Sequence, residues 1–316
     1  MFLFVAFYRR KRHPLTAPNP KTMHVRKDLL PSAVLFILLG ISLLSCNKTM
    51  ISEPAPVPGT GSAAVMTAAT QTAAVLNSSW SVNWNNYTDG HYTAGNACTD
   101  FGNAVSWTDS RAWISSGVLR IRLQPNALSS ASGILSNIEV APGTAYEIDY
   151  DVRFHSQFDW SRGGKLGFGF LVGDGNTGGN PAWQGNGGSI RLIWYQTSAG
   201  RTVFQPYLYY KDQPDSAGDH FGLSYPATGT IARGKWYHVH LYIQSNTGSN
   251  TNGRAAIAIN GAVLLNTAIR WTTNDSKRFI RSICFHTFRG GDTPDWESAT
   301  LGYIYYDNLV VHKICG

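Results

Sequence analysis

The chain has 316 residues, of which 43% are apolar and ten are tryptophan, enough to fill the core of a folded domain and too many for a disordered chain. Its formal charge of +7 is uneven, because residues 1–46 hold seven of the 26 Lys and Arg residues and one of the 19 acidic residues. The remaining 19 basic and 18 acidic residues nearly balance. The rest of the chain therefore lacks the long-range positive field that gathers nucleic acid, and we expect no nucleic-acid partner.

The first segment is typical of an exported lipoprotein. A basic stretch precedes an apolar run, residues 31–45, that is short for a membrane span and ends at Cys46. The residues Leu43-Leu44-Ser45-Cys46 resemble the lipobox of bacterial lipoproteins, in which the cysteine is acylated. A start at Met23 gives a more ordinary signal peptide than a start at Met1, and a plain signal anchor is the alternative. We predict a lipoprotein signal peptide over 1–46 and a lipid on Cys46 that anchors the protein to the outer membrane of the bacterial cell envelope, periplasmic or surface-exposed.

The next segment, residues 47–75, is rich in Pro, Ala, Thr, Gly and Ser and predicts a flexible linker. All ten tryptophans follow it, so residues 76–316 are expected to form one domain. This domain has three cysteines, and we expect Cys98 to pair with Cys315, since end strands of a sandwich often lie side by side. Cys284 lies in an apolar run and is expected in the core.

The domain alternates apolar and polar residues with a period of two, and turn residues interrupt it at short intervals. Helical patterns of ordinary length are absent. Asn260-Gly261 between two apolar runs indicates a hairpin. Many strands over this length predict an all-β antiparallel sandwich, of jelly-roll or concanavalin-A-like type. The clearest predicted strands are 118–123, 145–154, 188–195, 203–210, 236–243 and 303–311.

Strand phase singles out one group of polar side chains. Leu166, Phe168 and Phe170 share one strand face, which leaves Lys165 on the other. By the same alternation, Ser189 and Arg191 point away from the apolar residues of their strand, and Tyr207 and Tyr209 share a face. If the three strands are neighbours, one patch on the non-core face contains Lys165, Ser189, Arg191, Tyr207 and Tyr209.

A family resemblance falls on the same residues. The Gly163-Gly-Lys-Leu166 run, the Gly-Gly-Ser-Ile-Arg run that ends at Arg191, the Tyr207-Leu-Tyr209 pair and the late run 285–291 resemble the alginate and glucuronan lyases of polysaccharide lyase family 14. The resemblance covers roughly residues 80–312. It implies a jelly-roll sandwich whose concave sheet carries the Lys, the Ser-x-Arg pair and the Tyr-x-Tyr pair. The sequence departs from the family pattern at Gly167, where a Pro is frequent, and in the Gly- and Asn-rich segment 173–187.

The resemblance implies an acidic polysaccharide substrate, alginate or glucuronan, cleaved by β-elimination. Such a lyase removes the C5 proton beside a carboxylate and expels the C4 oxygen, so negative charge builds on the carboxylate. Lys165 or Arg191 is expected to neutralise this charge, and Ser189 to orient the substrate. Tyr207 or Tyr209 is expected to act as base, acid or both. This requires a phenol pKa well below its free value of about 10, and we expect the adjacent cations to lower it.

Two other functions remain open from the residues alone. Glycoside hydrolases on this sandwich use paired carboxylates, and Glu147-Ile-Asp149 begins such a motif, but Val152 stands where the second Glu belongs. A non-catalytic carbohydrate-binding module would keep aromatic side chains such as Trp183, Trp194 and Tyr195.

No cofactor or catalytic metal is expected. His238, His240 and His286 have no Cys or carboxylate partner at a convincing metal-binding spacing, and the Gly-rich run 172–179 lacks the ending of a phosphate loop. A structural Ca²⁺ ion stays open. We expect the domain to be a monomer.

Overall fold

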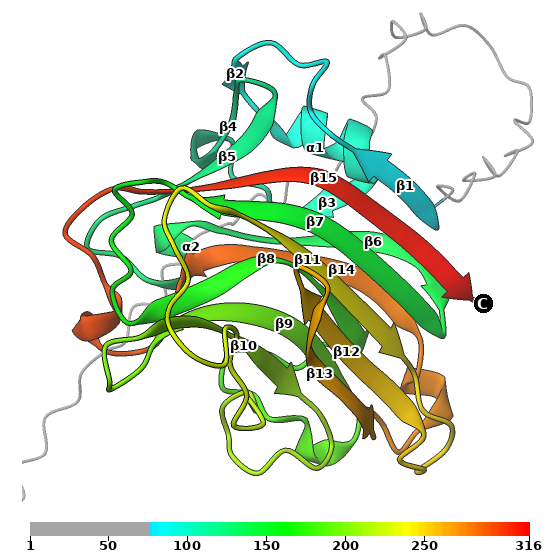
Figure 1. Cartoon of the computed structure of the whole chain (residues 1–316). Helices are drawn as coiled ribbons and strands as arrows, with labels where there is room; N and C mark the ends of the chain where they lie inside the picture. Colours follow the sequence, from blue (N-terminus) through cyan, green and yellow to red (C-terminus); the bar gives the residue numbers. More distant parts are fainter. Residues whose placement is uncertain (1–75) are drawn as a thin grey trace, which may run out of the picture. The chain divides into compact units, whose positions relative to one another are not determined.

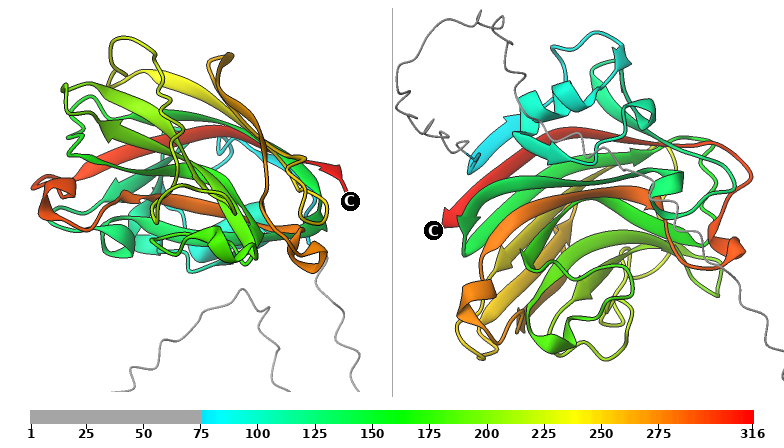
Figure 2. Two further views of the ribbon diagram at one scale, coloured as in Figure 1. Left: turned by 90° about the horizontal axis from the view of Figure 1, so that it is seen from below. Right: turned by 180° about the vertical axis from the view of Figure 1, so that it is seen from behind.

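The computed structural model describes residues 76–316, so the predicted signal peptide, the lipidation site Cys46 and the predicted linker lie outside the described residues. Residues 76–316 form two β-sheets that pack face to face, and every strand pairing within them is antiparallel (Figure 1). Strand β15 of one sheet and strand β14 of the other lie in different layers (Figure 2). The predicted all-β sandwich is confirmed.

The larger sheet, here called the large sheet, has nine strands. Their spatial order is β13 (Ala262–Ile269), β12 (Gly253–Ile259), β11 (Trp236–Gln244), β7 (Ala145–Phe154), β15 (Gly302–Cys315), β5 (Val118–Leu123), β4 (Ala112–Ser115) and β2 (Gly90–His91), and β1 (Ser79–Val82) also pairs with β15.

The small sheet has six strands and carries the candidate site. Their order is β10 (Thr202–Tyr209), β9 (Gly187–Gln196), β8 (Gly163–Gly173), β14 (Ile280–Arg289), β6 (Ile134–Gly143) and β3 (Asn103–Val105). The helices are short: α1 (Ala94–Phe101), α2 (Ser129–Ser132) and the 3-10 turns η1 (Asp109–Arg111), η2 (Ala182–Gln184), η3 (Asp275–Lys277) and η4 (Pro294–Trp296).

The core lies between the sheets and is strongly aromatic. Tyr150 of β7 packs edge-on against Phe168 of β8, with ring centroids 5.4 Å apart, and Phe168 also contacts Phe285 of β14 at 4.6 Å. Alternate residues of each strand fill this layer, which is why the period of two predicted the strands. The other alternate residues of β8, β9 and β10 are left for the opposite face of the small sheet.

The hairpin predicted from Asn260-Gly261 is present in the structure. Asn260 and Gly261 have positive φ values of 50° and 78°, as a two-residue turn between β12 and β13 requires. The eight-residue helix α1 was not predicted; its signal is the capping box formed by Thr93 and Asn96. No helix among residues 76–316 is long and apolar enough to cross a membrane.

The predicted Cys98–Cys315 disulfide is wrong. Cys315 is an exposed free thiol at the end of β15, and Cys98 lies in α1. The end of β15 is instead paired with β7, where Cys315 lies opposite Ala145. Cys284 is buried and free, as expected.

Candidate active site

Three neighbouring strands bring the predicted catalytic residues together. Strand β9 pairs with β8 on one side and with β10 on the other, which places Arg191 opposite Tyr207 and Ser189 opposite Tyr209. The Lys165 amine lies over the Tyr207 ring, 4.1 Å from its centroid. The strand adjacency that the sequence analysis assumed is therefore present, and Lys165, Arg191 and Tyr207 form one cluster on the face of the small sheet that points away from the core.

Arg191 is a buried cation without a counter-ion. It is 3% exposed, its Nε and Nη2 atoms have no hydrogen-bond partner, and it forms no ion pair within residues 76–316. Its guanidinium carbon lies 5.4 Å from the centroids of both the Tyr207 and Tyr209 rings. A buried charge of this kind is costly unless a partner neutralises it, so its surroundings are built for an anion.

A glycine makes room for this arginine. A Cβ atom on Gly169 would lie 2.3 Å from the Ile190 carbonyl oxygen, 3.1 Å from Arg191 Cγ and 3.2 Å from Cys284 Sγ. Gly169 thus lets β8 approach the Arg191 side chain closely. Simple alternation along β8 would put Gly167 on the same face as Lys165, but a Cβ atom on Gly167 would point into the core. Its φ is +65°, and the Cβ would meet the core rings of Tyr306 and Tyr150.

The environment makes Lys165 a candidate base. Burial, with a smaller contribution from the positive charge of Arg191, lowers the pKa of Lys165 to about 7. The amine is therefore substantially neutral near neutral pH, and a neutral amine can accept a proton. General bases are most effective when their pKa lies near the working pH.

The expected lowering of the tyrosine pKa is wrong for Tyr207. Burial and the neighbouring Tyr209 raise the pKa of Tyr207 to about 12, and the opposing effect of Arg191 is smaller. The phenol therefore stays protonated in the unliganded site. In this state Tyr207 is suited to donate a proton or a hydrogen bond, and Lys165 becomes the candidate proton acceptor.

Residues 174–186, which connect β8 to β9 within the Gly- and Asn-rich segment 173–187, are hydrogen-bonded to two predicted site residues. The Ser189 hydroxyl donates to the Asn176 carbonyl at 2.8 Å, and the Gly179 amide donates to the Tyr209 phenol oxygen at 3.0 Å. Ser189 is fully buried and Tyr209 is 1% exposed. Both side chains thus hold this segment in place, and substrate contact by Ser189 remains a prediction.

Two residues of the site were not predicted. His286 of β14 is 4% exposed, its Nδ1 atom has no hydrogen-bond partner within residues 76–316, and its Nε2 atom lies 3.3 Å from Asn137 Oδ1 of β6. Burial, together with the charges of Arg191 and Lys165, lowers the pKa of His286 to about 3, so the ring is neutral. The run 285–291 contained the signal, but only the order of strands β8, β14 and β6 brings His286 and Asn137 to the site.

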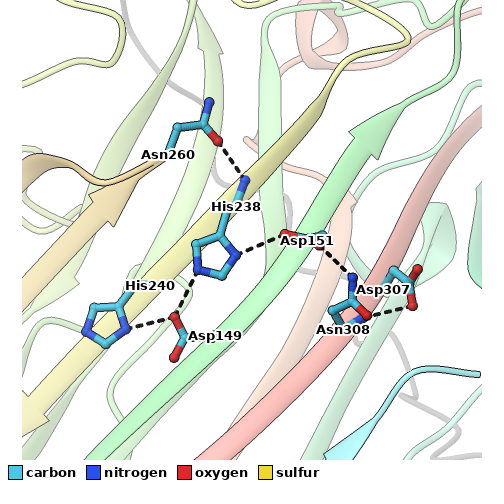
Figure 3. A network of polar contacts seen from close by, with 7 residues as sticks. All are labelled: Asp149, Asp151, His238, His240, Asn260, Asp307 and Asn308. Carbon is cyan, nitrogen blue, oxygen red and sulfur yellow. Dashed lines mark hydrogen bonds and ion pairs between the residues drawn. The ribbon is translucent and has the colours of Figure 1, made fainter.

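The residues of the rival functions lie elsewhere. Glu147 and Asp149 belong to β7 of the large sheet, and Asp149 contacts His238 and His240 on the outer face of that sheet (Figure 3). Trp194 is fully buried in the core, whereas Trp183 is 45% exposed. Within residues 76–316, no group of three or more His, Cys, Asp or Glu side chains is arranged to hold a metal ion.

Comparisons with known proteins identify the family of this chain. The family model described as Polysaccharide lyase 14 matches residues 126–309. The structure of alginate lyase Aly36B is 63% identical, with a TM-score of 0.76, over 76% of this chain and 99% of that one. The PL-14 alginate lyase from Aplysia kurodai is 19% identical, with a TM-score of 0.59, over 75% of this chain and 100% of that chain, and shares the fold. A search of curated protein sequences finds no match.

The chain therefore belongs to polysaccharide lyase family 14. The predicted family and enzyme class are confirmed: the protein is a lyase that acts on uronic-acid polysaccharides.

Proposed function

We propose that this enzyme cleaves alginate by β-elimination at the cluster of Lys165, Arg191 and Tyr207. The observation that carries the proposal is the buried, unpaired Arg191 guanidinium beside a lysine of lowered pKa. A uronate supplies what this arrangement lacks, because its carboxylate neutralises the arginine and its C5 proton needs a base.

The solved relatives support alginate as the substrate. Alginate lyase Aly36B, 62% identical to this chain, was solved with alginate tetrasaccharide after a lysine and a tyrosine had been replaced by alanine. Those two positions are separated by the same number of residues as Lys165 and Tyr207. A second Aly36B structure contains alginate trisaccharide.

In the proposed reaction, Arg191 binds the substrate carboxylate and stabilises the charge that develops on it. The neutral Lys165 amine takes the C5 proton and becomes an ammonium ion. The electron pair left at C5 forms the C4–C5 double bond and expels the C4 oxygen, which takes a proton from the Tyr207 phenol or from the newly formed ammonium. The products are a new chain end and an unsaturated uronate, and no water is consumed.

The test is the ultraviolet absorbance of the unsaturated uronate. Full-length protein is incubated separately with polymannuronate, polyguluronate, glucuronan and hyaluronan, and Lys165→Ala is the control. A rise with an alginate block and none with the control is the expected result. A rise with glucuronan or hyaluronan alone would overturn the assignment to alginate, and no rise with any polymer would overturn the proposed site chemistry.

We further propose that the enzyme works as a monomer held at the outer membrane of the bacterial cell by a lipid on Cys46. The support is the basic stretch, the short apolar run and the Leu-Leu-Ser-Cys sequence at its end. Metabolic labelling with a fatty acid should mark the parent and not Cys46→Ser, and light scattering of detergent-solubilised protein should give one chain per particle.

A further inference from the structure

We propose that the outer face of the large sheet carries a second binding surface, which holds an acidic polysaccharide chain away from the active site. It is a row of six side chains across six neighbouring strands, in which each of two arginines lies between aromatic residues. The row, here called the aromatic–arginine row, consists of His91, Trp113, Arg120, Tyr305, Arg153 and Trp236.

The strand register builds this row. Each member lies directly opposite the next one along: His91 faces Trp113, Trp113 faces Arg120, Arg120 faces Tyr305, Tyr305 faces Arg153, and Arg153 faces Trp236. Alternate residues on these strands fill the core, so the row faces outward. Five strand spacings of about 4.8 Å give a length of about 24 Å, enough to contact several consecutive sugar rings.

The two arginines are held between rings. Arg120 lies 5.8 Å from the Trp113 ring and 5.1 Å from the Tyr303 ring, and Arg153 lies 4.6 Å from the Trp236 ring and 4.7 Å from the Tyr305 ring. Cation–π contact fixes a guanidinium in place but leaves its N–H donors free for an anion.

Positive charge on the row is not neutralised by the protein. Neither Arg120 nor Arg153, nor the adjacent Arg122, forms an ion pair within residues 76–316. The next residues along β7, β15 and β11 are different: Asp151, Asp307 and His238 belong to a network of carboxylates and histidines (Figure 3). This acidic border restricts a polyanion to the row itself, which runs across the strands.

The occupant that fits is a chain of acidic sugars. Sugar rings stack on exposed aromatic faces, and carboxylates bind guanidinium groups, so a repeating uronate matches both elements of the row. The choice of uronate rests on the proposed function. The row belongs to the large sheet and the catalytic cluster to the small sheet, so this surface would retain the polymer without taking part in its cleavage.

The test is electrophoresis of the full-length protein in native gels that contain polymeric alginate, with Lys165→Ala in every variant to prevent degradation. One variant removes the charges (Arg120→Gln with Arg153→Gln), and a second removes the rings (Trp113→Ala with Trp236→Ala). The matched control removes two charges outside the row (Arg254→Gln with Lys313→Gln). Thermal unfolding checks that every variant is folded.

We expect both row variants to bind the polymer about tenfold more weakly than the control, with a binding that weakens at high salt. With Lys165 restored, turnover of alginate tetrasaccharide should be unchanged. Parental retardation of both row variants would overturn the proposal, as would an equal loss in the control or a parallel loss of tetrasaccharide turnover. Failure of the proposed function is a separate result, since it appears as no unsaturated product from the parent.

Discussion

The Lys165 amine lies 4.1 Å from the centre of the Tyr207 ring, so the proposed base and acid are in contact before any substrate binds. Burial acts on both groups, but with opposite effects on their pKa values: that of Lys165 falls to about 7 and that of Tyr207 rises to about 12. Between these values the amine is neutral and the phenol is protonated. When the environment shifts the pKa values of two neighbouring groups in opposite directions, one group can act as the base and the other as the acid.

Replacement of Lys165 should separate charge from proton transfer. Lys165→Arg keeps a cation in the site, but a guanidinium does not lose its proton at neutral pH. If the amine is the base, Lys165→Arg and Lys165→Ala should both lower kcat by at least about a thousandfold, whereas Lys165→Arg should bind alginate tetrasaccharide about as tightly as the parent. The measurement is initial-rate absorbance together with calorimetric binding. Substantial activity in Lys165→Arg would show that only the positive charge is needed.

The rate should depend on pH through the same group. Because the neutral amine is the active form, kcat/KM should fall about tenfold per unit as the pH decreases below about 7 and should level off above it. The pKa of His286 is about 3, so that ring should add no second step in this range. Rates at constant ionic strength between pH 5 and pH 9 test this. A flat profile across pH 7 would argue against Lys165 as the base.

Tyr207 and Tyr209 should differ in their effects. Tyr207→Phe removes a proton donor over the Lys165 amine and should lower kcat about a hundredfold or more. Tyr209→Phe removes the acceptor of the Gly179 amide, so it should loosen the segment 174–186 and act mainly on KM. Steady-state kinetics on one alginate block measure both, with circular dichroism as the folding control. Equal losses of kcat would show that both phenols take part in the reaction.

Arg191→Met should abolish activity and increase the free energy of unfolding. The methionine fills much of the space but removes a buried charge without a counter-ion, so the free energy of unfolding should rise by about 1 to 3 kcal/mol while activity is lost. Arg254→Met, at an exposed position on β12, is the matched control and should change neither strongly. Urea unfolding gives the free energies. A less stable Arg191→Met protein would mean that the guanidinium is satisfied within the fold.

The network on the large sheet should affect stability and not catalysis. The hydrogen bond between His240 and Asp149 raises the pKa of His240 above 6.5. The stability that this hydrogen bond contributes is therefore present below pH 6.5 and is lost as the pH rises through the folded-state pKa of His240. Burial acts to raise the pKa of Asp149, but its hydrogen bonds and the charges of His240 and His238 lower it below 3.8. The stability that ionised Asp149 contributes is therefore present above pH 3.8 and is lost as the pH falls through the folded-state pKa of Asp149.

Asp149→Asn should thus cost most near pH 5, by less than about 1 kcal/mol because the groups are partly exposed, and little at pH 9. Denaturant unfolding at both pH values measures the difference, and alginate turnover should be unchanged. A loss of turnover would connect this face to catalysis and revive the carboxylate motif that begins at Glu147.

The fold and the positions of three candidate site residues could be predicted because both depend on alternation within single strands. Within each strand, the site residue alternates with core residues and so points to the other face of the sheet, as for Lys165, Arg191 and Tyr207. A period of two in the sequence predicts this orientation without knowledge of the neighbouring strands. Gly167 breaks the rule, because the pairing of β8 with β9 shifts between Leu166 and Phe170 and resets the phase locally.

The remaining features depend on contacts between distant parts of the chain. His286 and Asn137 reach the site only because β14 and β6 follow β8 in the small sheet. The raised pKa of Tyr207 depends on burial, to which the loop after β10 contributes by placing Gly218 against the Tyr207 ring. The position of Cys315 opposite Ala145 likewise depends on the pairing of β15 with β7 and not on a local signal.

The unpaired guanidinium of Arg191 also makes the folded state incomplete without its ligand. Any uronate that binds the native site and not the unfolded chain adds to stability in proportion to the logarithm of its concentration, by about 2.7 kcal/mol at a hundred times the dissociation constant. The polysaccharide is then a protectant of the enzyme as well as its substrate. An enzyme built in this way resists heat and proteolysis best where polymer is abundant and becomes easier to degrade as the polymer is used up.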